Sequence, residues 1–146
     1  MAVLIDNRQN KFTMPLETIK QKALVALNAL DCPDGELSIV LTDDPQIQEL
    51  NREYLHRDRA TNVMAFPMLE GEFQDITPSL LGDVVISVET ADKEAQIAGM
   101  SFMERFDQLL IHGILHLFGY DHEHDEQEAA EMEDKAAELL TRISGM

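Results

Sequence analysis

The stretch SFMERFDQLLIHGILHLFG, residues 101–119, constrains the fold more than any other part of the chain. Its apolar residues recur at helical spacing and also cover most of the remaining surface of the predicted helix. A helix that is apolar on most sides is stable in water only when other elements cover it. We therefore expect the helix over 101–119 to be the central and most buried helix of the molecule.

Strands and helices alternate around this segment. Apolar periodicity predicts helices over 15–30, 43–55, 90–100 and 125–144, strands over 2–5, 36–42, 62–68 and 80–90, and a polar loop over 70–79. Interleaved elements of this kind favour an α+β (mixed α/β) fold, with a small mixed β-sheet of about four strands covered by helices. The 146 residues fit one domain over 1–146 that is large enough to bury a core.

The composition indicates a globular cytoplasmic protein with no membrane partner. Hydrophobic residues make up 45% and charged residues 27% of the chain, and no window approaches the roughly 18 apolar residues of a membrane span. The first twelve residues contain an early acid and no long apolar core, so we expect no secretory signal. Cys32 is the only cysteine, which excludes an internal disulfide and predicts a small buried or half-buried side chain.

The charge is strongly acidic and unevenly distributed. The net charge of −17 repels nucleic acid on average, so a nucleic-acid partner would have to meet a local basic patch. Arg52, His56, Arg57 and Arg59 form the one basic cluster that runs against the overall charge. The nine acids between residues 121 and 138 are predicted to form a solvated helix face.

Three of the five histidines lie in HGILHLFGYDH, residues 112–122. His112 and His116 are four residues apart and therefore project from the same face of a helix. His122 reaches that face only if the chain turns back, and Gly119 is placed to end the helix and allow the turn. The spacing is that of the metzincin zinc site, although buried or surface histidines on an apolar helix are the alternative.

Three histidine ligands at this spacing predict one zinc ion per chain with an open fourth position. An open position holds water, which is typical of a catalytic zinc site rather than a structural one. Asp107 or Asp121 could orient the ligands, although a turn is the commoner role for Asp121. Gly113 stands where zinc peptidases have their glutamate base, so the string does not favour a peptidase.

Beyond the spacing, the string resembles the signature H-G-x-L-H-L-x-G-Y-D-H of the YbeY family of bacterial zinc-dependent endoribonucleases, the rRNA maturation factors. NREYLHRDRATNVMAFP, residues 51–67, is similar to the family segment N-x-x-Y-R-x-x-D-x-x-T-D/N-V-L-S-F-P, and LLGDVVISVETA, residues 80–91, to L-G-D-I-x-I-S-x-E-x-A. The three blocks stand in the family's order and span residues 51–122.

The resemblance implies a nuclease specific for single-stranded RNA. Its implied partners are rRNA and the small ribosomal subunit, with roles in 3′-end maturation and ribosome quality control and with no DNA partner. His112, His116 and His122 would be the metal ligands and would act in catalysis through the metal. Asn62, Gly82 and Asp83 have structural explanations at strand ends, and Asp83 could also support the ligands.

Three residues depart from the family pattern: Leu55, and Ala60 and Ala65, which stand where the family has proline and serine. Leu55 follows Tyr54 where the family usually has arginine, a residue of the RNA-handling side of the site. Arg57 or Arg59 could supply the substrate-binding charge instead. The alternative is that both arginines only offset neighbouring acids such as Asp58.

The predicted function is thus single-strand-specific RNA cleavage in rRNA processing. A ribosome-assembly or RNA-binding factor that zinc stabilises and that does not itself cleave is the first alternative. A zinc hydrolase acting on another substrate, such as a peptide, is the second.

Overall fold

A computed structural model describes residues 3–68, 80–120 and 125–146 of the chain. In chain order the elements are β1 (Val3–Asn7), α1 (Leu16–Ala29), β2 (Glu36–Thr42), α2 (Asp44–Leu55), β3 (Val63–Pro67), β4 (Leu80–Ser87), α3 (Val88–Ala98), α4 (Phe102–Leu117) and α5 (Glu126–Ile143). No helix within these residues is long and apolar enough to cross a membrane.

The strands form one mixed sheet of four strands in the order β1-β2-β4-β3. β1, β2 and β4 pair in parallel, whereas β3 pairs antiparallel with β4 and occupies one edge. This arrangement confirms the predicted α+β fold with a small mixed sheet. The edge position of β3 matters for function because one side of its backbone has no neighbouring strand in the sheet.

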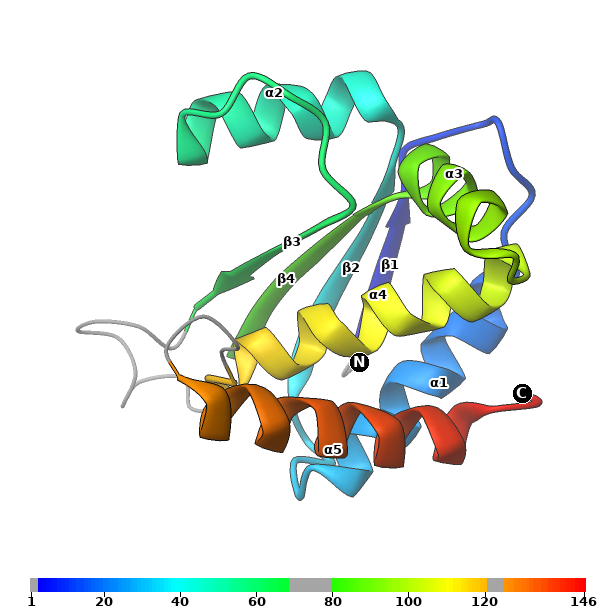
Figure 1. Ribbon diagram of the computed structural model, residues 1–146. Coiled ribbons are helices and arrows are strands. Elements are labelled where there is room, and N and C mark those ends of the chain that lie inside the picture. Colours follow the sequence, from blue (N-terminus) through cyan, green and yellow to red (C-terminus); the bar gives the residue numbers. More distant parts are fainter. Residues whose placement is uncertain (1–2, 69–79, 121–124) are drawn as a thin grey trace.

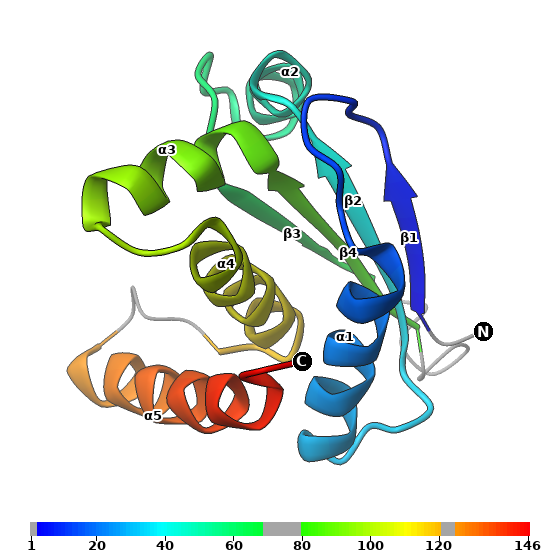
Figure 2. The ribbon, with the colours of Figure 1, turned by 90° about the vertical axis from the view of Figure 1, so that its right-hand side faces the viewer.

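Helices cover the two faces of the sheet unequally. α1 and α4 pack against one face, and α5 lies behind them as an outer layer against α4 and α1 (Figures 1 and 2). α2 covers part of the opposite face, where Ile47 packs against Met64 of β3 and Val85 of β4. The edge strand β3 therefore lies between α2 on one face and α4 on the other.

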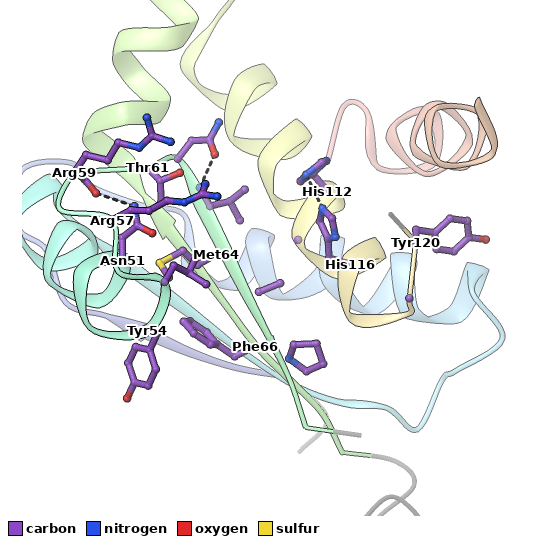
Figure 3. Close-up of a pocket in the computed structure, with 17 residues that line it drawn as sticks. Asn51, Tyr54, Arg57, Arg59, Thr61, Met64, Phe66, His112, His116 and Tyr120 are labelled. Atoms are coloured by element: carbon purple, nitrogen blue, oxygen red, sulfur yellow. Dashed lines mark hydrogen bonds between the residues drawn. The ribbon is translucent and has the colours of Figure 1, made fainter. Parts of the chain in front are cut away.

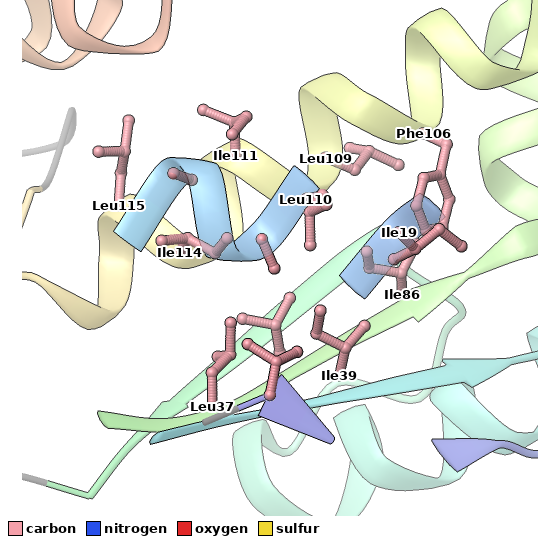
Figure 4. Packing of buried hydrophobic residues seen from close by; sticks show 14 of the residues in the cluster. Ile19, Leu37, Ile39, Ile86, Phe106, Leu109, Leu110, Ile111, Ile114 and Leu115 are labelled. Atoms are coloured by element: carbon pink, nitrogen blue, oxygen red, sulfur yellow. The ribbon is translucent and has the colours of Figure 1, made fainter. Parts of the chain in front are cut away.

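α4 is the central helix, as predicted. Its buried residues outnumber its exposed ones, and Leu110, Ile114 and Leu115 are fully buried. Leu110 and Ile114 point toward the sheet, where Ile39 of β2 and Ile86 of β4 lie, whereas Leu115 points away from it (Figure 4). Because each fully buried Leu or Ile side chain is worth about 1.5–3 kcal/mol, this contact fixes the position of α4 on the sheet.

Both ends of α4 have the signals that the sequence contains. Ser101 and Glu104 form a capping box at the start of the helix. At the other end, Gly119 has φ +90°, its N–H donates to His116 O at 3.0 Å, and Tyr120 N–H donates to Leu115 O at 3.1 Å. These two bonds form a Schellman motif, so the prediction that Gly119 ends the helix is confirmed.

Several element boundaries differ from the predictions by one to three residues. Residues 88–90 belong to α3 rather than to the preceding strand, because the Ser87 side chain accepts a hydrogen bond from Thr90 N–H and starts the helix there. β1 continues to Asn7, two residues beyond its predicted end. The predicted loop over 70–79 lies outside the described residues.

Candidate functional site

A cavity of about 700 Å³ wraps around the outer edge of β3 (Figure 3). α2 and the residues after it form one wall, β3 forms the floor, and α4 forms the other wall. The lining residues are Asn51, Tyr54, Leu55, Arg57, Arg59, Thr61, Asn62, Val63, Met64, Ala65, Phe66, Pro67, His112, Gly113, His116, Gly119 and Tyr120.

The floor of the cavity is an open strand edge. Ser87 N–H donates to Asn62 O at 3.0 Å, and Met68 N–H donates to Leu81 O at 2.9 Å, so these two positions face β4. In an antiparallel pair the bonded positions alternate, and the backbone N–H and C=O of Ala65 therefore point away from β4. The cavity floor thus presents peptide groups as well as side chains.

His112 and His116 project from successive turns of α4 into this cavity (Figure 3). Their Nε2 atoms are 2.9 Å apart, and the ring planes are inclined at 73°. The predicted convergence of these two side chains is therefore present in the structure. His122 and His124 lie outside the described residues, although Gly119 and Tyr120 begin the turn that leads to them.

The two imidazoles fit a shared zinc ion. Two nitrogens bound to one tetrahedral zinc at about 2.1 Å lie about 3.4 Å apart, so small ring rotations from 2.9 Å would suffice. Both rings offer Nε2, and both are half-buried at the cavity wall, where a metal ion can be reached by substrate. Within the described residues the set has two members, and the third predicted ligand is His122.

Gly113 has a steric reason for its identity. A Cβ at this position would lie 2.6 Å from Val84 Cγ1 and 3.2 Å from Val63 Cγ2. Both contacts are to β-branched side chains held in the sheet, which cannot move aside easily. The glutamate base of zinc peptidases therefore has no room at this position.

Arg57 and Arg59 line the wall opposite the histidines and are exposed. Across residues 3–68, 80–120 and 125–146, neither guanidinium is paired with a carboxylate. Asp58 instead accepts a hydrogen bond from Gln48 Nε2 at 3.0 Å. Among the described residues, no ion pair therefore supports the alternative that both arginines only offset neighbouring acids.

The segment that carries these arginines is held in place by the end of α2. His56 adopts the left-handed conformation with φ +59° and ends the helix, and Arg57 N–H donates to Asn51 O at 3.2 Å. The buried Asn51 side chain donates from Nδ2 to Arg59 O at 2.9 Å. These bonds fix the backbone on both sides of Asp58 and keep the two arginines at the cavity.

The start of α2 is tied to the start of α3. The Asp44 carboxylate accepts hydrogen bonds from Ser87 Oγ at 2.6 Å, from Thr90 Oγ1, and from Lys93 Nζ at 2.7 Å. Partial burial raises the pKa of Asp44, but the hydrogen bonds from Lys93, Ser87 and Thr90 outweigh it and hold the pKa below its usual value. Glu89 of α3 accepts from Asp44 N–H at 2.8 Å.

Of the three acids considered as supports for the histidines, Asp107 and Asp83 do not serve that role, and Asp121 lies outside the described residues. Asp107 accepts from Lys22 Nζ at 2.9 and 3.0 Å, between α4 and α1. Burial raises the pKa of the Asp107 carboxyl against the opposing effect of Lys22. Asp83 alternates with Val84 on β4 and lies on the same face as Val85, the face that α2 covers, away from α4.

The structure adds aromatic residues that the sequence analysis left without a functional role. Tyr54 and Phe66 line the α2 side of the cavity, and Tyr120 lines the α4 side. The strand pattern of 62–68 could have indicated that Phe66 shares a face with Met64. It could not indicate that the cavity would surround the strand edge.

Comparison with known proteins shows the family to which the chain belongs. Residues 4–144 match the family model described as Endoribonuclease YbeY. Proteins named Endoribonuclease YbeY from Geobacter metallireducens and Syntrophotalea carbinolica are 50% and 48% identical, over 96% and 95% of this chain and 94% and 93% of theirs. The solution structure of TM1509 from Thermotoga maritima matches with a TM-score of 0.72 and 27% identity, covering 98% of this chain and 89% of that one. The chain therefore belongs to the YbeY family.

Proposed function

We propose that this chain is a zinc-dependent endoribonuclease that cuts single-stranded RNA in the cavity between α2 and α4. It would act in the cytoplasm, and its roles would be the maturation of small-subunit rRNA and ribosome quality control. Relatives that carry the name Endoribonuclease YbeY and cover almost the whole chain support the nuclease activity.

The charge of the cavity is the observation that carries this proposal. Acids make up 28 of the 146 residues, yet none of the described residues that line the cavity is acidic. Two arginines and two histidines line it instead. In a chain with a net charge of −17, such a cavity is where a polyanion can approach the protein closely.

His112, His116 and His122 would hold one zinc ion per chain. When bound, zinc would supply a Lewis acid for a phosphate oxygen and would lower the pKa of a coordinated water molecule. The imidazoles must be neutral to act as ligands, and their position one turn apart on a buried helix limits how far they can separate.

The other groups of the cavity would bind and orient the substrate. Arg57 and Arg59 would hold the phosphate on the wall opposite the histidines and offset charge that develops on it. The outward N–H of Ala65 offers a further donor on the cavity floor. An unpaired strand suits this site because its backbone can bend around the edge of β3.

A ribosome-assembly factor that binds RNA without cutting it is the second candidate. It is favoured by Leu55, which lines the cavity and is 53% exposed at the position where the family pattern has arginine. If Arg57 cannot replace that arginine, the protein would bind RNA but cleave it poorly. Replacing Leu55 with arginine would then raise the rate of cleavage.

The test is cleavage of matched single-stranded and duplex RNAs by the wild-type protein and by Arg57→Ala and Arg59→Ala. We expect cleavage of the single strand only, with a loss of about 10-fold or more for at least one variant. Arg52→Ala is the matched control, because Arg52 belongs to the same basic cluster but does not line the cavity. Equal losses for Arg52→Ala and Arg57→Ala would mean that overall charge, not the cavity, sets the activity.

A further inference from the structure

An exposed aromatic side chain stands at the mouth of the cavity. Tyr54 lies in the last turn of α2 and is 58% exposed, although it is large and mostly apolar. Its ring meets that of Phe66 edge to face, with centroids 5.4 Å apart and planes inclined at 68°. This contact uses only part of the tyrosine ring and fixes its direction, and the exposed remainder of the ring presents a flat surface beside the cavity.

The surroundings of this ring indicate what it would bind. Arg57 follows Tyr54 by three residues, lines the same cavity and has no carboxylate partner among residues 3–68, 80–120 and 125–146. An aromatic face next to a cation that is free to bind an anion is the combination that nucleotides require, one group for the base and one for the phosphate. A peptide segment would have to be acidic to bind the two unpaired guanidinium groups of Arg57 and Arg59.

We propose that Tyr54, supported by Phe66, is a stacking platform for one unpaired nucleobase of the RNA whose phosphate Arg57 binds. This inference rests on the proposed function and adds a positioning subsite to it. Because every base has a π-face, the platform would tolerate any sequence, but it requires a base that is not paired in a duplex. It therefore supplies a physical reason for single-strand specificity that the histidines and arginines alone do not.

The proposal is tested by steady-state cleavage and by substrates that lack one base. Tyr54→Ala should raise KM for single-stranded RNA about 10-fold while kcat changes less than about 3-fold, and Tyr54→Phe and Tyr54→Trp should keep the wild-type KM. Leu4→Ala is the control, since Leu4 is 61% exposed on β1 and does not line the cavity. A thermal melt of each variant checks that it is folded.

A single abasic nucleotide is then moved through the RNA one position at a time. One position should raise KM for the wild-type protein and leave Tyr54→Ala unaffected, because both changes remove the same stacking contact. The proposal is overturned if Tyr54→Ala cleaves like the wild type, or if Tyr54→Leu restores KM as well as Tyr54→Phe does. The second result would indicate a general apolar contact, as with a protein partner. A wild-type protein that neither binds nor cleaves RNA would overturn the proposed function itself.

Discussion

Gly113 of α4 lies so close to Val84 of β4 that a Cβ at position 113 would come within 2.6 Å of Val84 Cγ1. The glycine thus sets the distance between the histidine-bearing helix and the sheet. The same contact separates this cavity from a peptidase site with a similar histidine spacing, since any side chain at position 113 would collide with Val84 of the sheet.

Replacing Gly113 with alanine should lower the free energy of unfolding by about 1–3 kcal/mol through overpacking, despite the better helix propensity of alanine. Urea denaturation measures the change. Val84→Ala should remove most of this effect of Gly113→Ala, because it deletes the atom with which the new Cβ collides. A Gly113→Ala protein as stable as the wild type would show that α4 can move away from the sheet at little cost.

The Asp44 contacts between α2 and α3 predict a pH dependence of stability. The pKa of Asp44 is lowered in the folded state, so its contribution is complete above the unfolded value of about 3.9 and is lost as pH falls through the lowered pKa. Asp44→Asn should therefore flatten the decrease in unfolding free energy below about pH 4. Asp92→Asn is the control, because Asp92 is a partly exposed carboxylate on α3 that, among the described residues, accepts a side-chain hydrogen bond only from Gln96. If both variants keep the wild-type acid profile, the Asp44 network does not contribute to it.

The Lys22–Asp107 pair is the most buried ion pair among the described residues, with side chains 4% and 14% exposed. Lys22→Met should lower the free energy of unfolding, measured by urea denaturation, by about 3 kcal/mol. This is the lower end of the range for such pairs, because Asp107 keeps some contact with water. The double variant Lys22→Met/Asp107→Leu should recover most of that loss.

Loss of this ion pair should also make the free energy of unfolding depend on pH. The pKa of Asp107 is raised by burial, and removing Lys22 would raise it further. The unfolding free energy of Lys22→Met should then decrease as pH rises from about 4 towards neutrality, since ionisation of the buried acid opposes folding. The double variant should not show this slope. If the double variant keeps the same decrease in unfolding free energy with pH, the decrease must come from a group other than Asp107.

Local patterns in the sequence predict most of the fold. The apolar surface of 101–119 identified the central helix, Gly119 its end, and the alternation in 36–42 the strand β2. The mixed sheet followed from the order of the elements. The sequence predicts a strand over residues 88–90 because the β-branched Val88 and Thr90 do not reveal the cap that Ser87 forms.

Contacts between distant segments could not be predicted in this way. Lys22 and Asp107 are 85 residues apart, and neither has a local signal that it would be buried with the other. The histidine pair was predictable because i and i+4 on one helix is a local relationship. The cavity was not, since it depends on β3 becoming an edge strand with α2 and α4 on its two sides.

The most direct test of the account is cleavage of a single-stranded RNA that carries the 3′ end of immature small-subunit rRNA. The protein is compared as isolated, after chelation, after return of one equivalent of zinc per chain, and as His116→Ala. We predict cleavage that disappears with the chelator, returns with zinc and is absent in the folded His116→Ala protein. Cleavage at the wild-type rate by both the chelated protein and His116→Ala would contradict the account, because the activity would then not depend on a metal held by this histidine pair.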